Sequence, residues 1–137
     1  MKNLIFVIAT ALLASCSDLS TDPGGVNLLE GTWYLESLEP SGATIVPVSD
    51  PARYTASFDA DGRLGVRADC NQCSSVYSVE GAALDIGGLA CTRAYCGTES
   101  LFDDYVAALD DAASFDGTRT SLTVRSPRGT LRFLRGP

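Results

Sequence analysis

Hydrophobic and polar residues alternate along most of the chain beyond residue 30, and this pattern predicts short β-strands. Segment 32–39 places Trp33 and Leu35 on one face, and segment 54–58 alternates in the same way. A period of two is the spacing that puts alternate side chains on one side of a strand. The same alternation recurs at residues 64–66, 76–80, 83–86, 122–124 and 131–133. We therefore expect roughly seven or eight strands.

Turn-forming residues separate several of these segments. DADG at 59–62 and EG at 80–81 are hairpin signals, and SPRG at 126–129 has proline second and glycine fourth, as in a type I turn. The DADG motif also resembles the start of a calcium loop. It lacks the later ligands and the terminal glutamate of an EF-hand, so we interpret it as a hairpin turn.

Segment 99–113 has the period of a helix instead. Its apolar residues recur at helical spacing, and either Thr98 or Ser100 can cap its start. Asp103, three residues after Ser100, completes a capping-box match. The apolar positions are Leu101, Phe102, Tyr105, Ala108, Leu109 and Ala112, and the aspartates at 103, 104, 110 and 111 fall largely on the opposite face, which we interpret as solvated. We predict a mainly β (α+β) domain with one helix inserted before the last strands.

The first sixteen residues have a different character. Lys2 precedes an apolar run at residues 4–13, which is too short to span a bilayer and has the length of a signal-peptide core. The run ends in LASC at residues 13–16, which resembles a bacterial lipobox, so we expect removal of residues 1–15 and diacylation of Cys16. An ordinary secretory signal cut at the same place is the alternative. Residues 16–27 form the expected tether, leaving residues 28–137 as a single domain.

Acyl chains on Cys16, palmitate among them, would anchor the protein to a membrane. Two or more chains bind a bilayer stably, whereas one chain binds only marginally. Ser17 follows the modified cysteine in place of an aspartate, and this favours the outer membrane. We therefore expect a bacterial cell-envelope lipoprotein that is anchored at the outer membrane and faces the periplasm.

Charge and composition exclude several classes of function. The chain has a formal net charge of −7, which argues against nucleic acid as a partner, because nucleic-acid binding needs a basic surface. There is no histidine, and no lysine occurs after residue 2. Ser-His and Cys-His pairs, histidine metal ligands and Schiff-base lysines are therefore absent. We expect no catalytic residues, no metal and no cofactor; carboxylate or thiol chemistry is what a catalyst would have to use.

Four cysteines lie close together as a C-x2-C pair at Cys70 and Cys73 and a C-x4-C pair at Cys91 and Cys96. A zinc ribbon has two residues within each pair, so the second pair does not fit. A redox dithiol usually sits at the start of a helix, and none is predicted after Cys73. Exported chains meet an oxidising compartment, and we therefore interpret the four cysteines as two disulfides.

Four cysteines allow three pairings. Bridged cysteines need Cα atoms within about 7 Å of each other, so Cys70 and Cys73 could join only across a tight turn. If the two segments run antiparallel, Cys70 pairs with Cys96 and Cys73 with Cys91; if they run parallel, the pairs cross. We favour the antiparallel, nested pattern. Closing the outer loop would contribute roughly 3 kcal/mol in the chain-entropy model.

Several short motifs occur in the order found in one known family. They are GTWYL at 31–35, FDADGR at 58–63, CN at 70–71, SVY at 75–77 and TRAYC at 92–96, followed by the helix and the last two strands. This order resembles the META domain family, which includes the HslJ-like heat-shock lipoproteins, over about residues 28–135. The resemblance implies a small antiparallel β-barrel-like fold with a helix. It supports Cys70–Cys96 as the outer disulfide, with Cys73 and Cys91 as an added inner pair.

The resemblance also has departures and functional implications. Asp69 and Val76 stand where the family usually has glycine. Family members are associated with stress or drug tolerance at the envelope, and no catalytic residue carries over. The expected partner is an unknown envelope protein bound by a non-enzymatic monomer. The alternative is a small apolar ligand or lipid carried in the barrel cavity.

A few side chains invite a functional interpretation but have a structural one as well. We expect Asn71 to bond the local backbone and Arg93 to pair with a carboxylate. Four aromatic residues are expected in the core or at the barrel rim: Trp33, Tyr34, Tyr77 and Tyr95.

Overall fold

The computed structural model describes residues 26–137. The predicted signal peptide, the lipidation of Cys16 and most of the tether lie outside the described residues. No helix within residues 26–137 is long and apolar enough to cross a membrane. Val26 is already buried in the core, so the packed domain includes a residue that the sequence assigns to the tether.

The described chain forms ten strands, one short 3₁₀ helix and one α-helix. The strands are β1 (Trp33–Pro40), β2 (Val46–Pro47), β3 (Tyr54–Phe58), β4 (Arg63–Ala68), β5 (Asn71–Glu80), β6 (Ala83–Ile86), β7 (Ala90–Cys91), β8 (Ser114–Gly117), β9 (Ser121–Ser126) and β10 (Gly129–Arg135), with η2 (Pro51–Arg53) before β3 and α1 (Phe102–Asp110) before β8. Predicted turns at 59–62, 80–81 and 126–129 each join two consecutive strands.

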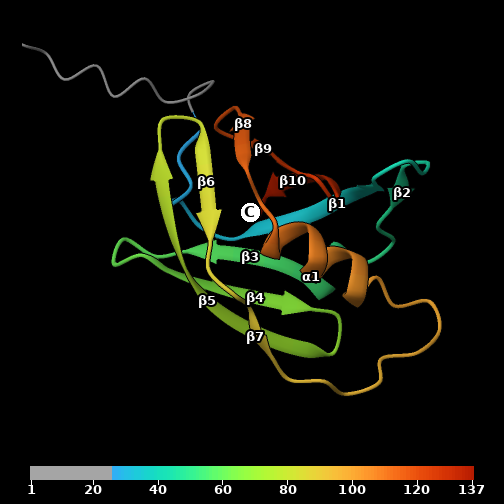
Figure 1. The fold of residues 1–137 in the computed structure, drawn as a ribbon. Helices are drawn as coiled ribbons and strands as arrows, with labels where there is room; N and C mark the ends of the chain where they lie inside the picture. The colour runs from blue at the N-terminus through green and yellow to red at the C-terminus, as the bar shows by residue number, and fades with distance from the viewer. Residues whose placement is uncertain (1–25) are drawn as a thin grey trace, which may run out of the picture.

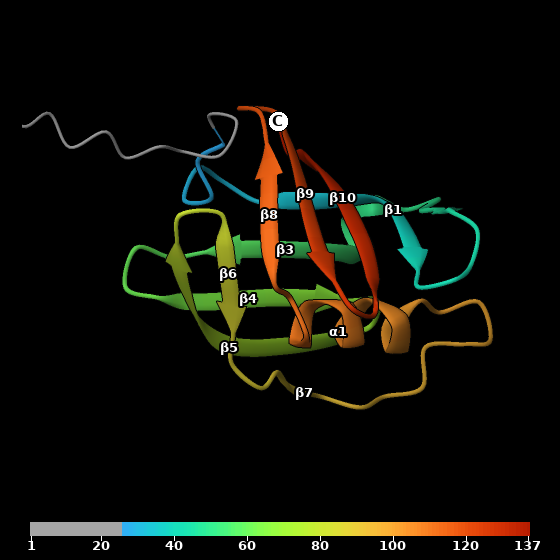
Figure 2. The same ribbon diagram turned by 45° about the horizontal axis from the view of Figure 1, so that its top comes forward.

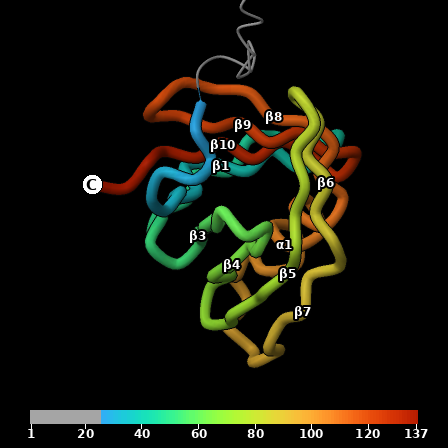
Figure 3. Tube along the Cα trace, turned by 90° about the vertical axis from the view of Figure 1, so that its left-hand side faces the viewer, coloured from blue at the N-terminus to red at the C-terminus, as the bar shows by residue number. Residues whose placement is uncertain are grey.

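Eight of these strands close into an antiparallel barrel, which confirms the predicted fold class. The order is β10-β9-β8-β6-β5-β4-β3-β1, and β10 pairs again with β1 to close the ring. Figures 1 and 3 show the ring from two sides. The two-residue strands β2 and β7 attach to β1 and β5 respectively and are additional to the ring.

The closing strand β1 contains an irregularity that the alternation pattern does not show. Its register with β10 shifts between Leu35 and Ser37, as a β-bulge does. Because the bulge resets the alternation, Trp33, Leu35 and Leu38 are all fully buried. At the far end of the same ladder, Gly129 has φ +150°, and a Cβ there would overlap the carbonyl oxygen of Glu39. The closure of the barrel therefore depends on this glycine.

Side chains fill the interior of the barrel. The largest fully buried ones come from both halves of the ring and from the helix: Trp33, Tyr105, Phe133, Leu35, Leu38, Leu64, Leu84, Leu109, Leu122 and Leu131. An eight-stranded barrel is just wide enough for its own side chains to fill it. The helix α1 lies within the outline of the ring when the barrel is viewed end-on (Figure 3), and its residues Tyr105, Ala108 and Leu109 are buried. It thereby covers one end of the core.

The helix is shorter than predicted and begins differently. It runs over Phe102–Asp110 within the predicted 99–113, and no side chain makes a capping-box bond at its start. Ser100 Oγ accepts a 3.3 Å hydrogen bond from the Phe102 N–H, while the Leu101 N–H donates to the Tyr54 hydroxyl at 2.9 Å. A tertiary contact from β3 thus takes the place of the predicted local cap.

Candidate functional site

The most distinctive part of the molecule is the irregular segment between β6 and α1, residues 87–101, which we name the β6–α1 loop. It contains only the two-residue strand β7 and otherwise has no regular structure. Figure 2 shows it running outside the barrel, beside β5, to the start of α1. Two of the four clustered cysteines, Cys91 and Cys96, lie on it, and the other two lie on or just before β5.

The four cysteines come together as two pairs at disulfide distance. Cys70 lies opposite Cys96 with a Cα–Cα distance of 5.6 Å, and Cys73 lies opposite Cys91 at 4.0 Å. This is the nested arrangement, because β7 runs antiparallel to β5. The bonds fasten the β6–α1 loop to the barrel at two points, and they leave a segment between Cys91 and Cys96 to be held by other means.

Asn71 holds that intervening segment. Its side chain is buried and reaches across to the loop. Its Oδ1 accepts hydrogen bonds from the Ala94 N–H at 2.8 Å and the Thr92 hydroxyl at 2.9 Å. Its Nδ2 donates to the Ala94 carbonyl at 3.0 Å and to Cys96 Sγ at 3.3 Å. The expected bonding to local backbone is therefore replaced by bonding to backbone distant in sequence, which ties the CN motif to the TRAYC motif.

The residue before Cys70 occupies an unusual conformation. Asp69 has φ +60°, the left-handed region, and it is the only non-glycine residue between 26 and 137 with a positive φ. Glycine adopts this conformation without strain, and Asp and Asn tolerate it better than other residues do. The family's usual glycine at this position is thus explained by the turn geometry. In this chain an aspartate takes the conformation that glycine adopts most readily.

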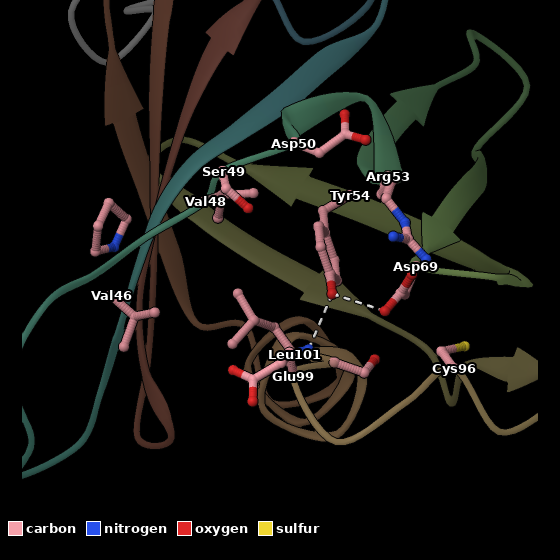
Figure 4. Close-up of a pocket in the computed structure, with 12 residues that line it drawn as sticks. Val46, Val48, Ser49, Asp50, Arg53, Tyr54, Asp69, Cys96, Glu99 and Leu101 are labelled. Atoms are coloured by element: carbon pink, nitrogen blue, oxygen red, sulfur yellow. Dashed lines mark hydrogen bonds and ion pairs between the residues drawn. The ribbon is translucent and has the colours of Figure 1, made fainter.

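The Asp69 side chain is used in a small polar network. It is 3% exposed and forms an ion pair with Arg53, whose side chain is partly exposed. The Tyr54 hydroxyl donates to Asp69 Oδ2 at 3.1 Å while it accepts the Leu101 N–H (Figure 4). Burial raises the pKa of the Tyr54 hydroxyl, and the neighbouring Asp69 carboxylate raises it further. The network links β3, the Asp69 turn and the start of α1.

A hollow of about 300 Å³ lies beside this network (Figure 4). Its walls come from the stretch that runs from β2 through η2 to the start of β3, from the Asp69 turn and from the end of the β6–α1 loop. They are lined by Val46, Pro47, Val48, Ser49, Asp50, Arg53, Tyr54, Asp69, Cys96, Glu99, Ser100 and Leu101. The sequence pattern identified Tyr54 only as a core residue and gave no role to Arg53. The signal that could have found the network is the non-glycine residue at a glycine position of the family.

A second, more open hollow lies on the outer side of the same loop. Arg93, Tyr95 and Phe102 contribute to its lining. Tyr95 is 82% exposed, so the expectation that it lies in the core or at the rim is wrong. Arg93 forms no ion pair within residues 26–137, so the expected carboxylate partner is not found in that range. Arg93 and Tyr95 are thus exposed to solvent, while Ala94 between them is hydrogen-bonded to buried Asn71.

The other residues considered from sequence have structural roles. Trp33 is fully buried; its Nε1–H donates to the Leu28 carbonyl at 3.2 Å, and the Arg135 guanidinium lies over its ring. Tyr77 is half-buried and donates its hydroxyl hydrogen to the Asp59 carbonyl at 2.7 Å. Val76, in place of the family's glycine, points outward with 64% of its surface exposed, which explains why a larger side chain is tolerated.

The aspartate-rich face of α1 is only partly a solvated surface. Asp110 accepts a hydrogen bond from the Leu89 N–H at 2.8 Å, and Asp111 pairs with Arg128. The first contact attaches the β6–α1 loop to the helix at a third point. Within residues 26–137, no group of three His, Cys, Asp or Glu side chains is arranged to hold a metal ion.

The fold resembles several solved structures. An NMR structure of a protein from Burkholderia xenovorans superposes with a TM-score of 0.63 at 19% identity and covers 99% of both chains. The crystal structure of a DUF4847 family protein from Bacteroides vulgatus gives 0.59 at 14% identity, over 80% of this chain and 94% of that one. Another NMR structure gives 0.59 at 24% identity, over 78% and 90% of the two chains. At these identities the likeness concerns the fold alone.

Sequence comparison gives the family. No curated protein sequence matches the chain. The model of the META domain family matches residues 26–136, and this range begins at buried Val26 and runs through the closing strand β10. The motifs that suggested this family from sequence now have structural roles: Trp33 in the closing strand, the β3–β4 turn, and Asn71 bonded to the TRAYC segment. The chain therefore belongs to the META domain family.

Proposed function

We propose that the protein is a lipid-anchored bacterial envelope protein whose META domain works by binding another envelope component and not by catalysis. Acyl chains on Cys16 would hold it at the outer membrane, and the residues that follow would tether a monomeric domain on the periplasmic side. Tolerance of envelope stress or of drugs is the role that the family resemblance implies. The bound component would be an envelope protein.

The observation that carries this proposal is the proximity of the two cysteine pairs, Cys70 with Cys96 and Cys73 with Cys91. Disulfides form and persist in oxidising compartments such as the bacterial periplasm, and they are rare in the cytosol. The LASC motif at residues 13–16 independently indicates export with lipid attachment. Two features far apart in the chain thus support the same compartment.

The state of the ionisable groups supports binding over catalysis. A catalytic carboxylate needs a free oxygen within hydrogen-bond reach of its substrate. Asp69, the buried carboxylate at the first hollow, is engaged by Arg53 and by the Tyr54 hydroxyl. By contrast, Arg93 and exposed Tyr95 belong to residue types enriched among binding hot spots, and a fixed segment loses little entropy when it binds.

The alternative, a carrier of a small apolar ligand, has less support. A carrier needs room inside the barrel, and here Trp33, Tyr105 and Phe133 all belong to the buried core and have almost no exposed surface. Tyr105 and Phe133 are 6.2 Å apart between ring centroids. The hollows that line the candidate site are instead on the outer surface, beside the β6–α1 loop.

Export and lipid attachment can be tested with the full-length chain in a bacterial host. We expect incorporation of an alkyne-labelled fatty acid, recovery in the outer-membrane fraction, and loss of both in the Cys16→Ser variant. Cys70→Ser is the matched control, because it removes a cysteine of the folded domain and leaves the lipobox intact. An unlabelled full-length chain in the cytosol, with free thiols, would contradict the proposal.

Binding can be tested by photo-crosslinking in the native envelope. A photoreactive amino acid at position 95 is expected to give a discrete crosslinked protein, whereas the same amino acid at Ala60, on the exposed β3–β4 turn, is expected to give none. A deletion strain should lose tolerance to heat, detergent or antibiotics. No crosslink at position 95, together with an unaffected deletion strain, would count against a binding role at this loop.

A further inference from the structure

The two cysteine pairs differ in how a thiol could reach them. In the outer pair Cys70 is solvent-exposed and Cys96 is half-buried, whereas in the inner pair Cys91 is half-buried and Cys73 on β5 is only 6% exposed. Thiol–disulfide exchange requires a thiolate to approach one sulfur of the bond, so access is a main determinant of its rate. The outer pair contains the one solvent-exposed cysteine of the four and is therefore more accessible to exchange than the inner pair.

The two sulfurs of the outer pair also differ from each other. Cys96 Sγ accepts N–H hydrogen bonds from the Cys70 backbone at 3.2 Å and from Asn71 Nδ2 at 3.3 Å. Within residues 26–137, no N–H donor reaches the sulfurs of Cys70, Cys73 or Cys91. The Ala94 carbonyl oxygen lies near both outer sulfurs, at 3.9 Å from Cys70 and 3.6 Å from Cys96, and does not distinguish them. Hydrogen bonds to a thiolate stabilise it, so Cys96 is the better leaving group.

We propose that Cys70–Cys96 is a thiol–disulfide exchange site for a dithiol reductant, attacked at Cys70 and releasing Cys96, while Cys73–Cys91 stays closed. The exposed sulfur is the one attacked, and the hydrogen-bonded sulfur is the one released. This inference rests on formation of the disulfides and is independent of the lipid anchor. The reductant is identified by its chemistry as a molecule or protein with two neighbouring thiols.

The reaction balances in two steps. The thiolate of the reductant forms a bond to Cys70 Sγ, the Cys70–Cys96 bond breaks, and its electron pair goes to Cys96 Sγ. The second thiol of the reductant, after losing its proton, attacks the reductant's own sulfur in the mixed disulfide and releases Cys70 as a thiolate. The thiolates of Cys70 and Cys96 each take up one proton, which balances the two protons lost by the thiols of the reductant. Two electrons reach the protein, and the reductant leaves as a disulfide.

Opening this bond has a local structural effect. Cys96 lines the 300 Å³ hollow and precedes the residues that lead to the start of α1. The inner bond and the β5–β7 pairing continue to hold the loop as far as Cys91. Reduction therefore leaves the barrel closed and removes the covalent bond at one end of the segment that presents Arg93 and Tyr95, which is then held by the inner disulfide and by the bonds of Asn71 to Thr92 and Ala94. The mobility of the loop surface thereby depends on the ratio of thiols to disulfides in its surroundings.

The site of attack can be mapped on the wild-type full-length protein with a monothiol. After brief treatment with glutathione, an acid quench and peptide mass spectrometry, we expect the glutathione adduct on Cys70. With dithiothreitol and alkylation, we expect Cys70 and Cys96 to be modified roughly tenfold faster than Cys73 and Cys91. Adducts mainly on Cys96, simultaneous opening of both pairs, or an oxidised mass that shows no disulfide would each overturn the proposal.

A variant pair separates the leaving-group effect from general loosening of the loop. Asn71→Asp keeps the Oδ1 acceptor and removes the Nδ2–H donor to Cys96, so reduction of the outer pair should slow several-fold. Thr92→Val removes a hydroxyl that bonds Asn71 Oδ1 and accepts from the Gln72 N–H, and leaves the donor to sulfur in place. Its reduction should be unchanged or faster. An Asn71→Asp rate equal to or above wild type would overturn the assignment of Cys96 as the leaving group.

Discussion

The barrel wall and the β6–α1 loop are held in place by different kinds of interaction. The wall is a continuous ring of backbone ladders around a buried core, and each strand has a partner on both sides. The loop pairs with β5 through the two residues of β7 and through two further backbone bonds, from Gly87 to Val76 and from Thr92 to Gln72. Its other fixed points are side chains: two cysteine pairs, Asn71, Ser75, the Tyr54 hydroxyl and Asp110. The wall distributes its stability over many contacts, while the loop concentrates it in a few.

This difference predicts how substitutions act. A change in the wall removes packing that the whole barrel shares, so its effect should appear as a loss of global stability. A change at one of the loop's fixed points should open the loop first and leave the barrel folded, because local opening costs less free energy than global unfolding. The candidate functional surface lies on the part of the molecule that is easier to alter.

The largest effect is expected for Trp33→Ala in the wall. It removes a fully buried ring and leaves the Leu28 carbonyl without its partner, which should cost about 3–5 kcal/mol of unfolding free energy. Urea denaturation followed by circular dichroism measures the loss. Tyr34→Ala, on the other face of the same strand, is the control and should cost at most about 1 kcal/mol. Equal losses of unfolding free energy in the two variants would mean that packing in the core is not the main source of the wall's stability.

Asn71→Ala should have the second-largest effect, and a local one. It deletes four hydrogen bonds and leaves the N–H and the carbonyl of Ala94 without their side-chain partner, which should cost about 2–3 kcal/mol of stability in the loop. Hydrogen exchange should accelerate at residues 92–96 and stay unchanged in β9 and β10. Ser74→Ala, an exposed neighbour on β5, is the control. Uniform acceleration across the barrel would show that the loop and the wall unfold as one unit.

A third comparison concerns the turn that joins the two regions. Asp69→Ala should cost about 2 kcal/mol, because it removes the ion pair with Arg53 and the bond from Tyr54. Asp69→Gly removes the same contacts and relieves the left-handed backbone, so it should be about 1 kcal/mol more stable than the alanine variant. Thermal unfolding of both variants measures the difference. An alanine variant as stable as the glycine variant would refute the role of φ at this position.

The smallest effect is expected from alkaline titration of two tyrosines. Burial raises the pKa of Tyr105 well above its ordinary 10.0, and burial together with Asp69 raises that of Tyr54. A raised pKa contributes stability that is complete below pH 10 and is lost as the pH rises through the folded-state value. NMR should show Tyr54 ionising while the barrel is folded, with loosening at Leu101, and Tyr105 ionising only on unfolding. Ionisation of Tyr105 before Tyr54 would contradict the prediction that the loop opens more easily than the barrel wall.

Much of the barrel could be predicted from sequence because its determinants are local. The period-two pattern placed Trp33, Phe58 and Val124 on the inner face, and the turn motifs placed the hairpins. The bulge in β1 could not be predicted, because it depends on pairing with both β3 and β10. The start of α1 was misplaced for the same reason, since the hydroxyl that binds the Leu101 N–H comes from β3.

The candidate site was less accessible to sequence reasoning. Spacing alone leaves the cysteine pairing open, and the nested pattern is favoured only because an antiparallel β domain is expected; β5 and β7 do run antiparallel. The Arg53–Tyr54–Asp69 network joins residues whose individual positions carry no chemical signature, and only the replacement of glycine by Asp69 marked the place. Tyr95 is exposed because the loop runs outside the barrel. Its aromatic side chain alone suggests a place in the core or at the rim.

The pairing of the first barrel strand with the last sets the timing of folding. Trp33 lies opposite Arg135, which is distant in sequence, so the ladder between them cannot form until the β10 segment is available. Contacts between residues so distant in sequence slow folding, and until they form, β1 has an open edge that can pair with other chains. A chain truncated before residue 129 should therefore fail to fold and should aggregate, and newly made copies would need protection until β10 has been synthesised.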